Sequence, residues 1–168
     1  MSVLVNSNHI FKPKQSHYDS LEVDEFWTYV GNKKNKVWLI YAYHRESGEI
    51  VAFVWGKRNA KTAKKLREEL SSLGVSFDVV YFVLRTQYKY TDDWDSFNNA
   101  FVADNHIIGK TNTVGIEGNN CRLRHRIRRA FRRTCCFSKK MLNHVKAFTL
   151  AFFYTCAAQS ASINFGYI

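Results

Sequence analysis

The chain has 168 residues, 46% of them hydrophobic and 15% aromatic, which is enough for one compact domain and excludes a disordered basic tail. Its 25 Lys and Arg residues outnumber 14 Asp and Glu residues, giving a formal net charge of +11. This excess predicts a polyanionic partner, and we favour nucleic acid over a membrane surface. No apolar run reaches the roughly 20 residues that span a bilayer, so we expect a cytoplasmic, nucleoid-associated protein with four free cysteines.

The first half of the chain shows the pattern of a small antiparallel sheet. Residues 1–20 carry the only proline and no sustained period, so we interpret them as an N-terminal arm or the remnant of a linker. Residues 21–168 are expected to form one domain. It opens with three segments rich in β-branched and aromatic residues, Leu21–Gly31, Val37–Arg45 and Ile50–Gly56. Short turns join them, which predicts a three-strand meander.

The hydrophobic period then changes to that of a helix. Asn59 is a suitable cap for this helix, and Gly74 ends it. The strand Phe77–Leu84 follows and is too hydrophobic for the edge of a sheet. A strand reached through one helix can return parallel to the first strand by a right-handed crossover. A short helix around Trp94 and a short strand, His106–Lys110, come next.

Two further helices are predicted in the last third of the chain. The second of them begins near Ser138, and the first carries seven arginines between Arg122 and Arg133. An apolar stripe runs beneath these arginines, with one polar exception: Ile116, Asn120, Leu123, Ile127 and Phe131. The charged faces predict contact with an anion. The order β-β-β-α-β-α-β-α-α predicts an α/β fold in which helices flank a mixed sheet.

Three carboxylates stand out on this map. Asp24 lies inside the first strand, Asp92 precedes the short helix, and Glu117 opens the arginine-rich helix. If the first and fourth strands are neighbours, these acids can converge at one end of the sheet. Phosphoryl transfer by two divalent cations about 3.5–4 Å apart needs such oxygen ligands.

Each acid also has a simpler interpretation. Asp24 can sit at a bulge or on a solvent face. Asp92 or Asp93 can cap the following helix, and the helix dipole favours Glu117 in a first turn whatever its function. The three interpretations remain open at this point, because local sequence alone does not decide between them.

Three motifs together resemble the catalytic part of the insertion-sequence-one family of bacterial transposases. They are VDEFWTYVG around Asp24, TDDW around Asp92, and the long segment from Thr113 to Lys140 that contains Glu117. The resemblance covers about residues 21–153, and the third motif is the most specific. It implies a ribonuclease H-like fold and DDE-type DNA strand transfer, with Asp24, Asp92 and Glu117 holding two Mg²⁺ or Mn²⁺ ions.

The same resemblance implies the binding partners. The expected partners are transposon-end and target DNA, further copies of the chain on that DNA, and a separate zinc-binding helix-turn-helix protein. The side chains expected to contact DNA lie in the third motif: Asn120, Arg122, Arg124, Arg126, Arg128, Arg129, Arg132, Arg133, Lys139 and Lys140. Asn120 and Arg124 lie one and two turns past Glu117 and face roughly the same way, so support of the site or of the scissile phosphate is a second expectation for them, beside plain packing of the helix face.

Two segments depart from the family pattern. YFVLRTQYKY separates FDVV from the TDDW motif, and TCAAQSAS interrupts the C-terminal aromatic segment. Two alternatives therefore stay beside an active transposase. One is a non-catalytic DNA-binding regulator or degenerate transposase copy with the same fold, and the other is a structure-specific nuclease that uses the same acids.

Overall fold

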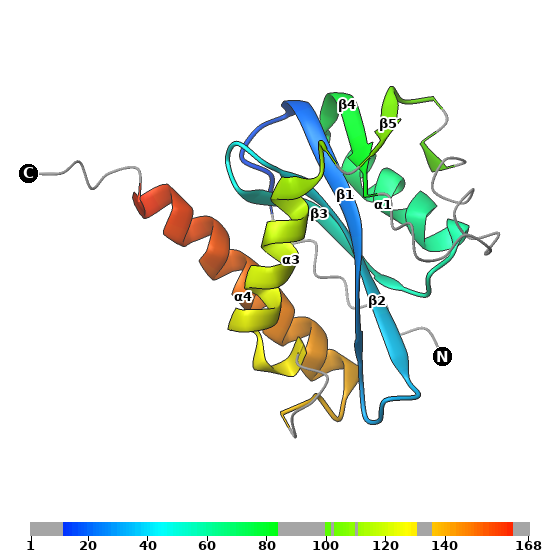
Figure 1. Ribbon diagram of the computed structural model, residues 1–168, viewed down its shortest axis with the longest axis vertical. Coiled ribbons are helices and arrows are strands. Elements are labelled where there is room, and N and C mark those ends of the chain that lie inside the picture. The colour runs from blue at the N-terminus through cyan, green and yellow to red at the C-terminus, as the bar shows by residue number, and fades with distance from the viewer. Residues whose placement is uncertain (1–11, 84–99, 102, 110, 131–135, 163–168) are drawn as a thin grey trace, which may run out of the picture.

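A five-stranded sheet forms the centre of the molecule (Figure 1). The computed structural model describes residues 12–83, 100–101, 103–109, 111–130 and 136–162, with side chains described as far as Phe153 in the last helix. The strands are β1 (His17–Tyr29), β2 (Lys36–His44), β3 (Glu49–Gly56), β4 (Ser76–Phe82) and β5 (His106–Ile108). The helices are α1 (Ala60–Ser72), α3 (Val114–Arg126), the short 3₁₀ helix η1 (Arg128–Ala130) and α4 (Met141–Ser162).

The strand order β3-β2-β1-β4-β5 confirms the predicted mixed sheet. β1 to β3 form the antiparallel meander, and β4 returns parallel to β1 after α1. β5 adds a second parallel pair beyond β4. β1 is therefore the central strand, and residues on it are flanked by strands on both sides. Asp24 therefore lies on a strand in the interior of the sheet.

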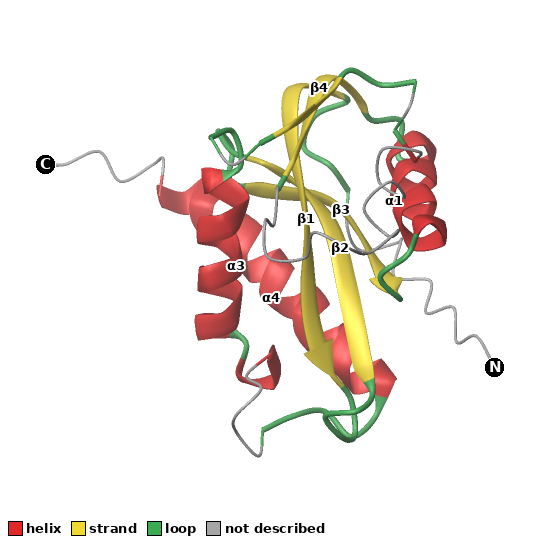
Figure 2. Ribbon diagram, turned by 45° about the vertical axis from the view of Figure 1, so that its right-hand side comes forward, coloured by secondary structure: helices red, strands yellow, loops and turns green. Residues whose placement is uncertain are grey.

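Helices cover both faces of the sheet (Figure 2). α1 packs on one face, where Leu66 and Leu70 are fully buried against the sheet. Its start is capped as predicted, since the Asn59 side chain accepts the Thr62 backbone N–H at 3.1 Å. The opposite face carries α3 and α4, which bury Phe26 of β1 beneath Leu123 and Phe148.

Some element boundaries differ from those predicted. β1 begins at His17 instead of Leu21, because residues 17–20 already pair with β4. The arginine-rich helix is not continuous to Arg133. α3 ends at Arg126, the backbone of Ile127 is extended, and η1 follows. The Ile127 side chain is nevertheless buried, so this break keeps Ile127 in the core with Ile116 and Leu123 of the predicted stripe, while Phe131 lies outside the described residues. The last helix begins at Met141 instead of Ser138.

Two further expectations concern the whole chain. Among the helices that the structure describes, none is both long and apolar enough to cross a bilayer. Cys121 and Cys136 are exposed free thiols, as expected. The side chains of Cys135 and Cys156 lie outside the described residues.

His144 fixes the first turns of α4 to the sheet. Its buried ring contacts Trp55 and Phe148, and its Nδ1 lies 3.0 Å from the Ser138 hydroxyl oxygen. Burial, with a smaller effect of the Arg129 cation, lowers the pKa of His144 from 6.5 to about 4. The folded protein therefore keeps this imidazole neutral at pH values where an unfolded chain protonates it.

We expect this difference to make folding stability depend on pH. Between pH 6.5 and 4 the unfolded state binds more protons at His144 than the folded state does. The free energy of unfolding is therefore unaffected by this residue above pH 6.5 and decreases as the pH falls toward 4. The loss amounts to about 3 kcal/mol. Urea denaturation at pH 7 and pH 4.5 checks this. The loss of unfolding free energy between the two should be clearly smaller in His144→Phe, and equal losses would contradict the role of His144.

Candidate active site

Two acids of the central strand face α3. Alternate residues of a strand point to the same side of a sheet, so Glu22, Asp24 and Phe26 share one face of β1. All three are buried, with Glu22 only 2% and Asp24 only 4% exposed. Buried carboxylates are costly unless they are hydrogen-bonded or bind a cation. The interpretation that places Asp24 on a solvent-exposed face is therefore wrong.

Both oxygens of the Asp24 carboxylate accept hydrogen bonds. Oδ1 accepts the Glu25 backbone N–H at 2.7 Å, and Oδ2 accepts the side-chain amide of Asn120. An ionised carboxylate accepts hydrogen bonds and binds cations through either of its two oxygens. Hard cations such as Mg²⁺ prefer such oxygen donors. The donor set around Asp24 thus fits a divalent cation.

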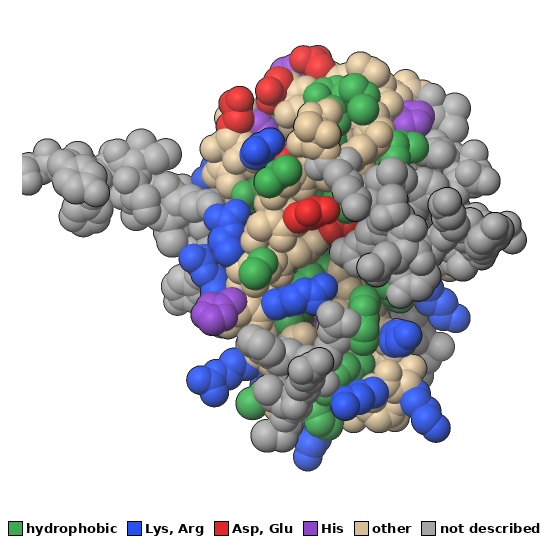
Figure 3. Space-filling view, in the orientation of Figure 1, with side chains coloured by type: hydrophobic (Ala, Val, Ile, Leu, Met, Phe, Trp, Pro, Cys, Tyr) green, Lys and Arg blue, Asp and Glu red, His purple; other side chains and the backbone are tan. Residues whose placement is uncertain are grey.

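Glu117 lies in the first turn of α3, above these strand acids. Its side chain is exposed, one helical turn before Asn120, whose amide contacts Asp24. Glu117 is also near enough to Glu22 for its charge to raise the pKa of that residue. Acidic side chains lie at the centre of the face shown in Figure 3, with Lys and Arg side chains beside and below them. The structure therefore brings the acids of β1 and α3 to one place.

Glu22 attaches the start of α3 to β1. One carboxylate oxygen accepts the backbone N–H of Ile116 at 2.6 Å, in the first turn of α3. The N-cap residue, Thr113, makes no side-chain capping bond, so Glu22 supplies the acceptor that a helix start needs. A Cβ atom on Gly115 would lie only 2.7 Å from the other Glu22 oxygen. Glycine at this position permits the close approach.

Opposing effects act on the pKa of the Glu22 carboxyl. Burial raises its pKa most, and the Glu117 charge raises it further. The Ile116 N–H and the Arg45 cation lower it, and the net direction is upward. Glu22 was not among the site residues predicted from the sequence. The available signal was its spacing, because a second acid two residues before Asp24 must share the same strand face.

Asp92 and its alternative Asp93 lie outside the described residues, so the structure does not place the second predicted ligand. The exit of β4 can be located. Val23 of β1 pairs with Phe82, the last residue of β4, and the Val83 N–H faces the Val23 carbonyl at 3.5 Å. The chain that leads to Asp92 therefore leaves the sheet next to Asp24.

The predicted DNA-binding residues separate into two groups. One group is exposed and includes Arg122, Arg126, Arg128, Arg129, Lys139 and Lys140. The other group is partly or fully buried. In it, the Arg124 guanidinium lies 4.3 Å from the centre of the Phe26 ring, and Asn120 contacts Asp24. Arg132 and Arg133 lie outside the described residues.

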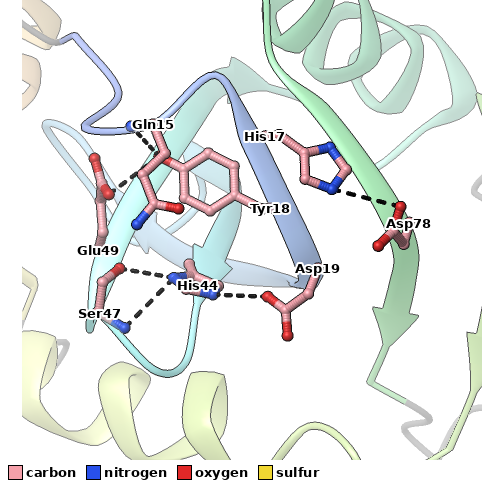
Figure 4. A network of polar contacts seen from close by, with 8 residues as sticks. All are labelled: Gln15, His17, Tyr18, Asp19, His44, Ser47, Glu49 and Asp78. Carbon is pink, nitrogen blue, oxygen red and sulfur yellow. Dashed lines mark hydrogen bonds and ion pairs between the residues drawn. The ribbon is translucent and has the colours of Figure 1, made fainter.

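A second polar cluster lies at the N-terminal end of β1 (Figure 4). His44 Nε2 lies 3.1 Å from an Asp19 oxygen, and Nδ1 lies 2.8 Å from the Ser47 hydroxyl. Ligand atoms of Asp19, His44 and Glu46 all lie within 4.8 Å of one another, a group that can hold a metal within the described part of the chain. Both His44 nitrogens already have partners, and the hydrogen bond from His44 lowers the pKa of Asp19. These contacts explain the cluster without an ion.

Comparison with known proteins identifies the family. Residues 20–153 match the family model described as IS1 transposase, and this range includes Glu22, Asp24, Asp92 and Glu117. The chain belongs to the IS1 transposase family.

Two relatives in this family illustrate the similarity. The Insertion element iso-IS1n protein InsB of Shigella dysenteriae is 37% identical over 125 residues, which cover 74% of this chain and 87% of that protein. The Insertion element IS1 2 protein InsB of Escherichia coli K12 is also 37% identical, over 74% of this chain and 68% of its own length. The resemblance of the three motifs to this family is thus confirmed.

The fold of this IS1-family chain resembles that of viral integrases. The catalytic core domain of HTLV-2 integrase, solved in complex with magnesium in a trimeric form, superimposes with a TM-score of 0.50. The match covers 85% of both chains at 14% identity. A simian T-cell lymphotropic virus intasome gives a TM-score of 0.51 at 15% identity, over 85% of this chain and 50% of that one. The predicted ribonuclease H-like fold is confirmed.

Proposed function

We propose that this chain is the catalytic subunit of an insertion-sequence transposase, which cuts transposon ends and joins them to target DNA with the help of divalent cations. The observation that supports this most strongly is the buried Asp24 carboxylate, which faces the helix whose first turn carries Glu117, in a chain of a transposase family. A buried carboxylate beside further acids is costly unless it is hydrogen-bonded or binds a cation.

Asp24, Asp92 and Glu117 are the proposed ligands of two Mg²⁺ or Mn²⁺ ions. When bound, such ions lower the pKa of a water molecule and stabilise charge on the attacking and leaving oxygens of a phosphodiester. Cleavage by water breaks one P–O bond and leaves a 3′-hydroxyl. That hydroxyl then attacks a target phosphorus atom, so a new phosphodiester forms as the target phosphodiester breaks and its 3′-oxygen leaves. Glu22 keeps the start of α3, and with it Glu117, against β1.

The exposed basic residues are the proposed contacts to DNA phosphates. Arg122 and Arg126 lie on α3, and Arg128 and Arg129 lie on η1. Lys139 and Lys140 precede α4. Arg132 and Arg133 lie outside the described residues, and we propose them as phosphate contacts from the sequence motif alone. Such contacts release counterions, so affinity should fall steeply with salt.

The proposal also includes assembly. Strand transfer acts on two transposon ends, which calls for at least two copies of the chain. The trimeric form and the intasome among the solved relatives are in keeping with oligomers on DNA. A separate zinc-binding helix-turn-helix protein would supply recognition of the end sequence.

The test is a cleavage and joining assay. The chain is mixed with a labelled duplex that carries an IS1 end and with a supercoiled target plasmid, in Mg²⁺, in Mn²⁺ and in EDTA. We expect nicks only with a metal, followed by joined products, and the nicks need not be confined to the element end because the assay contains no partner that recognises it. Metal-dependent nicks without joining would indicate a nuclease. Binding without nicks under every condition would contradict the proposal and indicate a regulator or degenerate copy.

A further inference from the structure

Four buried side chains form a continuous line of hydrogen bonds that ends at Asp24. The Asn119 amide donates to the Tyr41 hydroxyl oxygen at 3.3 Å, and the Tyr41 hydroxyl donates to Asn120 Oδ1 at 2.9 Å. The Asn120 amide then donates to Asp24 Oδ2. All four residues are buried. We call this line the Tyr41 chain.

The direction of each bond in the Tyr41 chain is fixed by its chemistry. A tyrosine hydroxyl has one proton, and its nearest acceptor is Asn120 Oδ1, since the Ile116 carbonyl is farther away at 3.5 Å. With its oxygen occupied, the Asn120 amide must present its NH₂ group to Asp24. Burial and the nearby Asp24 charge raise the pKa of Tyr41 well above its usual value, so the proton stays on the hydroxyl.

Strand pairing and the position of α3 bring the members of the Tyr41 chain together. Tyr41 of β2 is the residue paired directly with Asp24 of β1, so the two side chains project side by side toward α3. Asn119 and Asn120 come from the helix above them. Asparagine is a poor residue for a helix interior, and a buried amide is costly unless it is bonded. These bonds satisfy the NH₂ group of Asn119 and both polar groups of the Asn120 side chain.

We infer that Tyr41 and Asn120 are positioning residues that hold the Asp24 carboxylate in the orientation in which it binds a cation. This inference rests on the proposed function of Asp24 as a metal ligand. Without the Tyr41 hydroxyl, the Asn120 amide can rotate and turn its oxygen toward the carboxylate. Outer partners of a metal ligand typically change metal affinity 10–100-fold when they are removed. Asn120 thus acts through Asp24, in place of the direct DNA contact expected from the sequence.

The test uses Tyr41→Phe and Asn120→Leu in the full chain. Each replacement keeps the approximate volume of the side chain and removes the polar group of one residue, together with the two hydrogen bonds which that residue makes in the Tyr41 chain. Titration with Mn²⁺ alone, followed by electron paramagnetic resonance, should show an affinity about 10-fold weaker for Tyr41→Phe, and weaker still for Asn120→Leu. In the metal-free chain, NMR should show the Asn120 side-chain amide protons shifted downfield and slow to exchange, and Tyr41→Phe should abolish this protection.

Tyr18→Phe is the matched control. Tyr18 is equally buried and donates to a Glu49 oxygen at 3.1 Å, in the polar cluster of Figure 4, away from Asp24. Its loss should leave Mn²⁺ affinity and the Asn120 amide unchanged. Equal Mn²⁺ affinities of the wild-type and Tyr41→Phe chains, or an unaltered Asn120 amide, would overturn the inference. Absence of Mn²⁺ binding by the wild-type chain would instead overturn the proposed function, and the amide signals would still report the Tyr41 chain.

Discussion

Asp24→Asn is expected to lower metal-dependent cleavage of transposon-end DNA by at least about 10³-fold. Removal of an outer partner alone typically costs 10–100-fold, and loss of the ligand itself removes several kcal/mol of stabilisation, at a factor of ten for each 1.36 kcal/mol. The shape of the side chain is kept. The new amide has only one acceptor oxygen, whereas Asp24 accepts from both Glu25 and Asn120. One N–H group therefore also loses its acceptor.

The rate of cleavage in Mg²⁺, measured with saturating DNA, checks this expectation. Asp78→Asn is the matched control, because this carboxylate lies on β4 with a side chain that is 70% exposed. It should cleave at the wild-type rate. Far-UV circular dichroism establishes that both variants are folded. A folded Asp24→Asn chain that cleaves within 10-fold of the wild type would show that Asp24 is not a metal ligand.

Much of the fold was predictable from local patterns. The short turns between the first three strands predict an antiparallel meander, and the single helix before β4 is compatible with the right-handed parallel return that the structure has. These two facts place β1 at the centre of the sheet, so the depth of Asp24 follows from its strand. The start of β1 at His17 was not predictable, because residues 17–20 are extended only through their pairing with β4.

The candidate site was predictable in part. Asp24 and the start of α3 at Glu117 carry strong local signals, an acid in an apolar strand and an acid in a first helical turn. Asn120 was visible as a polar exception in an apolar stripe, one turn past Glu117, which indicated a role near the site but not its contact with Asp24. Its partner Tyr41 lies 79 positions away in the chain and has no distinguishing neighbours in sequence. Such a link depends on strand register and helix docking together, which no local pattern contains.

The break after Arg126 has the same kind of cause. Arginine favours helices, so the sequence Arg122–Arg133 predicts one continuous element. The structure instead turns at Ile127, whose side chain is buried with Ala130 beneath the helices. Tertiary burial of two apolar residues thus overrides the helical preference of the arginines between and before them. The basic residues consequently lie on two short elements instead of one.

The core beneath α4 provides the largest expected effect on stability. Phe148 is fully buried, and its ring contacts Phe26 of β1, Trp55 of β3 and Phe152 of its own helix. Truncation of a buried phenylalanine to alanine typically costs 3–5 kcal/mol, because a cavity replaces its contacts. Domains of this size are stable by only about 5–15 kcal/mol. Phe148→Ala should therefore remove a large share of the folding free energy.

Urea denaturation at pH 7 measures this loss, with Leu150→Ala as the matched control. Leu150 lies on the same helix, two residues later, and is 58% exposed, so its truncation should cost less than about 0.5 kcal/mol. Equal losses in the two variants would mean that α4 does not pack on the sheet through Phe148. Because Phe148 contacts Phe26, two residues from Asp24 on the same strand face, the truncation should also weaken Mn²⁺ binding at temperatures where the variant remains folded. Leu150→Ala should leave that binding unchanged, which separates a general loss of α4 surface from loss of support beneath the site.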